Sequence, residues 1–191
     1  MKIGILALQG DVREHAWAIQ NTGNEAVEVK KASQLEGLAG LIVPGGESTT
    51  IGKLMEEYGF FSAIKEKAEE GLGIYGTCAG LILLAKEIAG STQPRLGLMD
   101  IVAQRNAYGR QRESFETDLE IPVLGEEPFR SVFIRAPYIE AVGPEVQVLA
   151  TYDNKIVFAR QGRFLASAFH PEETEDLRVH RYFIRILKRE V

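Results

Sequence analysis

The chain has 191 residues, 45% of them hydrophobic and 26% charged, and its 22 basic and 27 acidic side chains give a formal net charge of −5. This composition is typical of a folded globular protein, and it excludes a disordered chain or one that coats a nucleic acid. The length fits a single domain over residues 1–191. A lone cysteine excludes an internal disulfide, and no apolar run approaches the ~20 residues of a membrane span. We therefore expect a cytoplasmic protein.

The first half of the chain alternates short apolar runs with helical patterns. In chain order, we expect strands at residues 3–8, 26–29, 41–43 and 72–75, and helices at 12–21, around 33–36, within 51–70 and from 79 onward. The short helix is predicted because Ser33 and Glu36 fit the N-cap and N3 positions of a capping box. Repeated β-α units of this kind predict the α/β class, with a doubly wound, mostly parallel sheet.

The second half is richer in strand patterns. Short β-like runs occupy residues 101–103, 131–134, 146–149, 156–159 and 164–169, with expected hairpin turns at Asp153-Asn154 and Gln161-Gly162. They predict a β-rich layer added to the parallel core. A helix is expected from about residue 174, with an acidic start and a basic end that complement its dipole. A basic helix can bind nucleic acid, but the acidic overall balance favours a solvated face and no nucleic-acid partner.

Three loops are expected to meet at one edge of this sheet. They lie at Gln9-Gly10, at Gly45-Gly46 and at Cys78, each directly after an expected strand. In doubly wound sheets, ligands bind beyond the carboxyl ends of the strands. The sequence therefore predicts that the three loops form one crevice.

Cys78 is the only cysteine, and it stands at the centre of Gly-Thr-Cys-Ala-Gly at residues 76–80. Small residues two before and two after a reactive side chain, between a strand and a helix, are typical of a nucleophile elbow. A thiol there lies at a helix N-terminus, which favours the attacking thiolate. The alternative is a buried structural thiol, because free cysteine is among the most buried residue types.

His170-Pro171-Glu172 offers a base and an orienting acid for such a thiol. Alternation along an extended chain puts His170 and Glu172 on the same side, and the proline disfavours a helix at His170. The alternative for His170 alone is a hydrogen-bonded structural histidine. His15 and His180 lie on helix-like stretches, where we expect structural roles, and no residue spacing predicts a metal site.

The loop at residues 44–49 follows a buried strand and contains Gly45 and Gly46. It does not fit a phosphate-binding loop, because Lys53 is followed by leucine and the glycine spacing differs. Adjacent glycines also let a backbone N–H approach a ligand closely, and an anionic intermediate on a thiol needs two such donors. The N–H groups of Gly46 and Ala79 are the expected pair, and a simple tight turn is the alternative.

Together these motifs resemble the class I (triad) glutamine amidotransferases. Within that class, residues 6–15, 45–50, 104–111 with 114–116, and 133–137 resemble the glutaminase subunits of two-protein pyridoxal 5′-phosphate synthases. The resemblance covers essentially the whole chain, and it implies a flavodoxin-like fold. It also implies that Cys78 is the nucleophile and that His170 and Glu172 complete the triad.

The resemblance further implies a set of residues that hold L-glutamine: Gly46, Glu47, Ser48, Arg105, Ile134 and Arg135. Arginine and glutamate suit a free amino acid, which carries a carboxylate and an ammonium group. Which of Arg105 and Arg135 meets the carboxylate stays open, and a surface salt bridge is the alternative role for each.

The implied activity is hydrolysis of L-glutamine to L-glutamate and ammonia, with the ammonia passed to a synthase subunit. The resembled family works as a hetero-oligomer of twelve synthase and twelve glutaminase subunits and needs no cofactor or metal in the glutaminase. We expect Gln9, at the end of the first strand, to contact the partner and to set the oxyanion loop. Three alternatives stay open at this stage: a DJ-1/PfpI-like cysteine enzyme, a non-catalytic binding module, and a glutaminase subunit for a different synthase.

Overall fold

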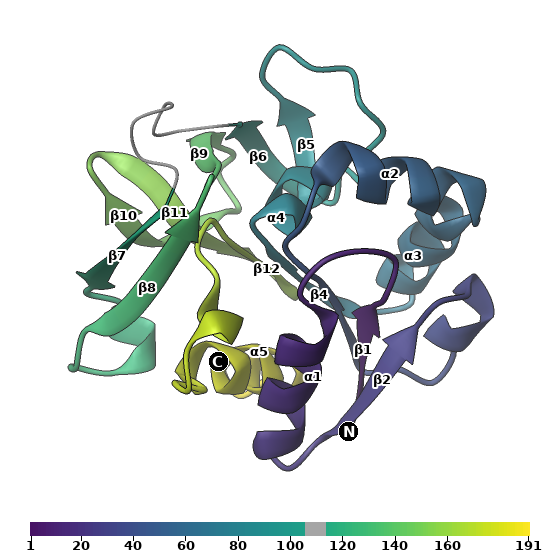
Figure 1. Cartoon of the computed structure of the whole chain (residues 1–191), viewed down its shortest axis with the longest axis horizontal. Coiled ribbons are helices and arrows are strands. Elements are labelled where there is room, and N and C mark those ends of the chain that lie inside the picture. Colours follow the sequence, from purple (N-terminus) through teal and green to yellow (C-terminus); the bar gives the residue numbers. More distant parts are fainter. Residues whose placement is uncertain (106–113) are drawn as a thin grey trace.

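The computed structural model describes residues 1–105 and 114–191 (Figure 1). Its strands are β1 (Lys2–Leu6), β2 (Glu25–Val29), β3 (Gly40–Val43), β4 (Gly73–Thr77), β5 (Ala85–Ile88), β6 (Met99–Gln104), β7 (Ser114–Leu119), β8 (Phe129–Ile134), β9 (Tyr138–Val142), β10 (Gln147–Tyr152), β11 (Lys155–Gln161) and β12 (Phe164–Ser167). Its α-helices are α1 (Val12–Asn21), α2 (Ser48–Glu57), α3 (Phe60–Glu69), α4 (Ala79–Leu84) and α5 (Arg178–Lys188). Short 3₁₀ helices are η1 (Ala32–Leu35), η2 (Pro122–Leu124) and η3 (Pro171–Glu173).

A 10-stranded sheet runs through the molecule in the order β2-β1-β3-β4-β12-β11-β9-β6-β5, and β10 pairs with β11. The neighbours from β2 to β12 are parallel, whereas β11, β9 and β6 add antiparallel pairs. β7 and β8 form a separate two-stranded sheet. The predicted α/β class, with a mostly parallel sheet and an added β-rich layer, is confirmed.

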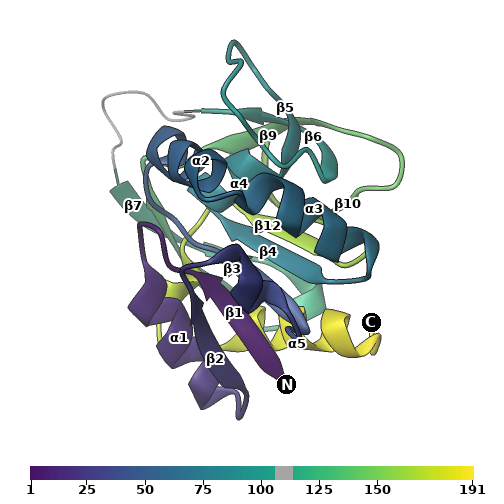
Figure 2. The same ribbon diagram turned by 90° about the vertical axis from the view of Figure 1, so that its right-hand side faces the viewer.

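The helices cover both faces of the parallel strands. α1 and α5 lie on one face, while α2, α3 and α4 lie on the other (Figure 2). Every residue of β3 and β4 is buried, which agrees with their continuous apolar sequences, because strands covered on both faces have no solvent side. Within the described ranges, no helix combines the length and the apolarity needed to cross a bilayer.

α5 shows how the sequence pattern fixes the packing. Val179, Phe183 and Leu187 are buried, the last two beside Gly40 of β3, and the basic residues Arg181 and Arg185 are exposed. This is the apolar stripe of an amphipathic helix with a solvated opposite face. The basic last turn lies at the helix C-terminus, where positive charge is favourable.

Some local predictions were wrong in detail. The segment after β2 is a 3₁₀ turn in which Gln34 accepts hydrogen bonds from the backbone N–H groups of Lys30 and Lys31, so Ser33 and Glu36 are not its capping pair. β5, β7 and β9 were not predicted, and α5 begins at Arg178 rather than near residue 174. The hairpin turn at 153–154 is confirmed, because Asp153 and Asn154 both have positive φ between β10 and β11.

Candidate active site

Cys78 lies in the tight turn between β4 and α4. Its φ of 48° and ψ of −98° are strained for a residue with a side chain. A Cβ on Gly76 would overlap the backbone of Gly80, and a Cβ on Gly80 would overlap the carbonyl oxygen of Val43. The small residues on both sides of Cys78 are therefore required by close backbone packing, and the strand-turn-helix context of the predicted elbow is confirmed.

The elbow is tied to its neighbours by hydrogen bonds. The N–H of Cys78 donates to the carbonyl oxygen of Ser167 at the end of β12, at 2.8 Å. The thiol lies 3.8 Å from the carbonyl oxygen of Ile134 and donates to it. The side chain is nearly buried, with the residue 7% exposed. Cys78 is thus held in a fixed position where β4, β8 and β12 end.

His170 and Glu172 are in contact directly beyond β12. His170 Nδ1 lies 2.8 Å from Glu172 Oε1, and the glutamate side chain is fully buried. Among the described residues, Nε2 of His170 has no hydrogen-bond partner. The pairing was predicted from an extended chain, but Pro171 begins the 3₁₀ helix η3 instead. The turn brings the two side chains together, and it leaves Nε2 available to a reacting group.

The charges of this pair are set by their surroundings. Burial alone would lower the pKa of His170, but its interactions with Asp11, Cys78 and Glu172 outweigh burial and raise the pKa to about 12. Burial opposes the charge of Glu172, yet His15 and His170 hold the pKa of this carboxyl well below its usual range. At neutral pH, His170 therefore carries a proton and Glu172 is ionised.

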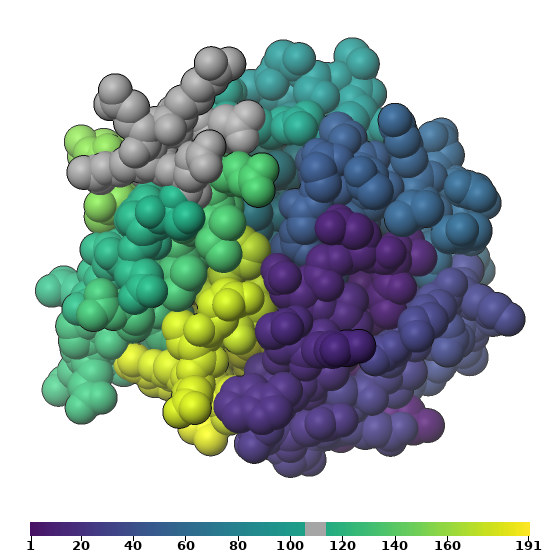
Figure 3. Space-filling view, viewed as in Figure 1, coloured from purple at the N-terminus to yellow at the C-terminus, as the bar shows by residue number. Residues whose placement is uncertain are grey.

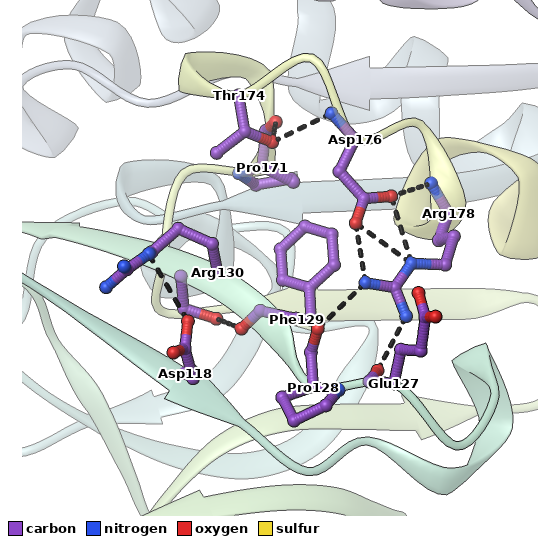
Figure 4. A network of polar contacts seen from close by, with 10 residues as sticks. Asp118, Glu127, Pro128, Phe129, Arg130, Pro171, Thr174, Asp176 and Arg178 are labelled. Atoms are coloured by element: carbon purple, nitrogen blue, oxygen red, sulfur yellow. Dashed lines mark hydrogen bonds and ion pairs between the residues drawn. The ribbon is translucent and has the colours of Figure 1, made fainter.

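The chain beyond Glu172 is anchored to the β7–β8 hairpin (Figure 4). The guanidinium of Arg178 donates to the backbone oxygens of Glu127 and Pro128 at 2.7 and 2.9 Å, and pairs with Asp176 at 2.6 Å. The hydroxyl of Thr174 donates to the carbonyl oxygen of Pro171 at 3.0 Å. Figure 3 shows the N-terminal and C-terminal segments side by side on one face. These contacts fix the loop that carries the histidine and the glutamate.

The loop after β1 holds the glycine loop after β3. Gln9 Oε1 accepts a hydrogen bond from the N–H of Glu47 at 2.8 Å. The N–H of Asp11 donates to the carbonyl oxygen of Gly45, and a Cβ on Gly10 would overlap that oxygen. Gly46 has a φ of 149°, which few other residues adopt. The predicted meeting of the loops is confirmed, while the oxyanion roles of Gly46 and Ala79 stay predictions.

Glu47 caps α2 and contacts Arg105. Its carboxylate accepts hydrogen bonds from the N–H groups of Thr49 and Thr50 at 3.3 and 2.8 Å. Burial opposes ionisation, but these bonds and those from the two threonine hydroxyls lower the pKa of Glu47 to about 2. Arg105 Nη2 lies 3.7 Å from the carboxylate, and Arg105 Nη1 donates to Gln93. Glu47 is thus a fixed negative charge at the N-terminus of α2.

Arg135 differs from Arg105. It is exposed, has a φ of 43°, and forms no hydrogen bond or ion pair with any other described residue. A guanidinium in that state is available to a ligand carboxylate.

A cavity of about 490 Å³ joins these groups, a size that suits a small-molecule site. It is lined by Gln9, Asp11, Gly46, Glu47, Ser48, Cys78, Ala79, Ile82, Arg105, Ile134, Arg135 and His170. Glu172 lies outside the lining. A larger cavity of about 690 Å³ along β5, β6 and β9 contains none of the predicted site residues. The smaller cavity is therefore the candidate active site.

Sequence reasoning missed two residues close to the triad. Asp11 Oδ2 lies 3.4 Å from His170 Nδ1, and His15 Nε2 lies 3.4 Å from Glu172 Oε1. The helix-like stretch around His15 predicts only a structural role for this histidine. Its position four residues after Asp11, at the start of the helix after the first strand, was the signal that it lies near the loops.

Asp11, His170 and Glu172 each offer an atom of a type that can bind a metal ion. Ligand atoms of Asp11, His170 and Glu172 lie within 4.8 Å of one another. The hydrogen bond between His170 and Glu172 accounts for this grouping, because an orienting acid must lie that close to its histidine.

Residues 106–111 of the block at 104–111 lie outside the described residues.

The sequence and the fold were compared with those of known proteins. A model of the SNO glutamine amidotransferase family matches residues 5–189. A pyridoxal 5′-phosphate synthase subunit PdxT from Moorella thermoacetica is 60% identical over 98% of this chain and 100% of its own length. A PdxT from Pelotomaculum thermopropionicum is 63% identical over 96% and 94%, respectively. A crystal structure of a glutamine amidotransferase matches with a TM-score of 0.93 and 56% identity, over 97% of this chain and 98% of the other.

Proposed function

The chain belongs to the SNO glutamine amidotransferase family, and from this premise we propose the residues and steps by which it works. It hydrolyses L-glutamine to L-glutamate and ammonia, and it supplies the ammonia to the synthase subunit that makes pyridoxal 5′-phosphate. The observation that carries the mechanism is the cavity shared by Cys78 and His170, with Glu172 2.8 Å behind the histidine.

The first half of the reaction forms a thioester. In the reactive state the thiol proton lies on His170 Nε2, as the raised pKa of this imidazole favours, and the thiolate Sγ of Cys78 attacks the side-chain amide carbon of glutamine. The oxyanion accepts hydrogen bonds from the N–H groups of Gly46 and Ala79. His170 then gives its proton to the amide nitrogen, the C–N bond breaks, and ammonia leaves. Cys78 now carries a γ-glutamyl group.

The second half releases glutamate. Water loses a proton to His170 and attacks the thioester carbon, and the C–S bond breaks as the intermediate collapses. The thiolate of Cys78 leaves beside protonated His170, so the reactive state of the enzyme is restored. Glu172 stays ionised throughout, and it holds the imidazole with Nε2 directed at the reacting atoms.

Substrate binding uses two opposite charges in the lining of the cavity. Arg135, which has no partner among the described residues, receives the α-carboxylate of glutamine. Glu47, ionised and half exposed, receives the α-ammonium, with Arg105 holding its far side. Ser48 and the backbone of Gly46 and Ile134 complete the contacts. These assignments suit a zwitterionic amino acid.

The proposal extends to the surroundings of the enzyme. Residues 1–191 act as one glutaminase domain in a hetero-oligomer of twelve synthase and twelve glutaminase subunits. Gln9, which bonds to the N–H of Glu47, transmits contact with the synthase to the oxyanion loop. The location is cytoplasmic, because the thiol must stay reduced to act as a nucleophile.

The test is glutamate release from glutamine by the wild-type chain, with and without the synthase subunit. Release that depends on Cys78 supports the mechanism. A Cys78→Ala variant with wild-type release would overturn it. Replacing Gln9 by Ala should lower release in the complex while the isolated chain keeps its unfolding midpoint, and unchanged release would remove Gln9 from the account.

A further inference from the structure

His15 contacts the triad from a buried position that the cavity does not reach. The side chain is fully buried, and it lies between Glu172 of η3, Thr77 of β4 and His180 of α5. Its Nδ1 is 3.0 Å from His180 Nε2, and its Nε2 is 3.1 Å from Thr77 Oγ1 and 3.4 Å from Glu172 Oε1. One imidazole thus touches both the orienting acid and the residue that precedes Cys78.

The carboxylate of Glu172 has few partners besides His15 and His170. Its Oε1 faces His170 and His15, while its Oε2 has no hydrogen-bond partner among the described residues. A fully buried carboxylate needs donors to offset its lost hydration. His15 is therefore one of the two described side chains that can donate a hydrogen bond to the buried carboxylate of Glu172.

The unpartnered nitrogen of His180 indicates which nitrogen of His15 carries the proton. His180 Nδ1 is buried and has no partner among the described residues. We expect this nitrogen to be unprotonated, because buried N–H groups without an acceptor are rare. His180 then carries its proton on Nε2 and donates to Nδ1 of His15.

The contacts of His15 on its Nε2 side agree with a proton on Nε2. With Nδ1 of His15 accepting, the proton of its neutral ring is on Nε2. That N–H is directed at Thr77 and Glu172. The opposite tautomer would place a lone pair against the carboxylate and leave a buried N–H of His180 without an acceptor.

We propose that His15 is a positioning residue for glutamine hydrolysis, which donates from Nε2 to Glu172 and thereby holds the carboxylate in line with His170. The inference rests on the proposed function. His15 does not touch the substrate, because neither it nor Glu172 lines the cavity. It acts by limiting the rotation of Glu172, so that the carboxylate keeps Nε2 of His170 directed at Cys78.

Two amide substitutions separate the two nitrogens of His15. His15→Gln places an amide N–H near the position of Nε2 and keeps a donor for Glu172. His15→Asn reaches only the position of Nδ1, so it keeps the contact with His180 and loses the one with Glu172. Tyr75→Phe is a matched control, because it removes a buried hydroxyl that bonds to Ser167 at 2.8 Å in the same cluster.

The assay is steady-state glutaminase activity of each variant in complex with the synthase subunit. We expect His15→Asn to lower kcat roughly 10- to 100-fold, the loss expected for a hydrogen bond to a charged group, with KM for glutamine changed less than about twofold. His15→Gln should keep kcat within about threefold of the wild type, and Tyr75→Phe should lower the unfolding midpoint without lowering kcat.

Equal losses in the Gln and Asn variants, or a wild-type kcat in the Asn variant, would overturn the proposal. Absence of glutaminase activity in the wild-type complex would instead overturn the proposed function. A measurement without variants is the ¹⁵N imidazole spectrum of the wild-type chain, in which Nε2 of His15 should be protonated and Nδ1 bare. A proton on Nδ1 alone would contradict the proposal even if the variants failed to fold.

Discussion

Replacing Glu172 by Gln removes the charge that orients His170 while keeping nearly the same side-chain volume. The carboxylate is fully buried and accepts from His170 Nδ1 at 2.8 Å. An amide at this position is neutral, and it can also present its NH₂ group to Nδ1. Presentation of the NH₂ group would favour the wrong tautomer, with the proton on Nε2 where the thiol proton has to go.

The magnitude follows from the contact. A hydrogen bond to a charged group contributes about 1.5–3 kcal/mol, which corresponds to a roughly 10- to 150-fold change in rate. Loss of the correct tautomer adds to this, since the equivalent change in a serine protease triad lowers kcat by about 10⁴. We therefore expect kcat to fall by at least ~100-fold, with KM for glutamine nearly unchanged because Glu172 lies outside the cavity lining.

The assay is glutamate release by the complex with the synthase subunit, at saturating and at low glutamine. The control is Glu173→Gln, a change of the same chemistry at the next residue of η3, where the side chain is exposed. It should leave kcat within about twofold, as surface substitutions usually do. A Glu172→Gln variant with kcat within about fivefold of the wild type would refute the reasoning that the carboxylate orients His170.

Three further outcomes are expected. Gly80→Ala should lower the free energy of unfolding in urea by about 1–3 kcal/mol, because the new Cβ would overlap the carbonyl oxygen of Val43. In the control Gly52→Ala the new Cβ meets only ordinary contacts, so this variant should be neutral or stabilising. Equal effects of the two substitutions would contradict the packing argument. Arg135→Ala should raise KM for glutamine about tenfold with little change in kcat, and an unchanged KM would exclude Arg135 from carboxylate binding. The pKa of His170 rises from 6.5 to about 12 on folding, so protonated His170 stabilises the folded chain relative to the His170→Gln variant. This difference in the free energy of unfolding should be full below pH 6.5 and should decline as the pH rises above it, in unfolding measurements from about pH 6 to 9. A difference that grew with pH would contradict the shift.

The fold and the positions of the residues proposed as the triad were accessible from sequence because local signals carry them. The helix at residues 12–21 was predicted with the bounds that α1 has, since an apolar strand, a turn and a glycine define its ends. The elbow at Cys78 was recognisable because one of its two glycines, Gly76, is required by a backbone contact with Gly80, only four residues later. His170 and Glu172 were paired correctly although the turn that joins them was not, because two residues of separation allow contact in either conformation.

The residues that sequence reasoning missed depend on long-range packing. His15 meets Glu172 only because α1 and η3 are packed together on one face of the sheet, and its contact with His180 spans 165 positions. Asp11 reaches His170 for the same reason. β5 escaped prediction because Lys86 and Glu87 interrupt its apolar pattern and its burial comes from pairing with β6. Such features belong to the tertiary arrangement, and no local pattern carries them.

The measurement that tests the central claim most directly is the mass of Cys78 during turnover. The complex with the synthase subunit is mixed with glutamine, quenched in acid within a turnover, digested and analysed by mass spectrometry. The account predicts one γ-glutamyl group on the peptide that contains Cys78, which accumulates before glutamate is released and is absent in Cys78→Ala. Glutamate release with no adduct on Cys78, or an adduct on another residue, would contradict it.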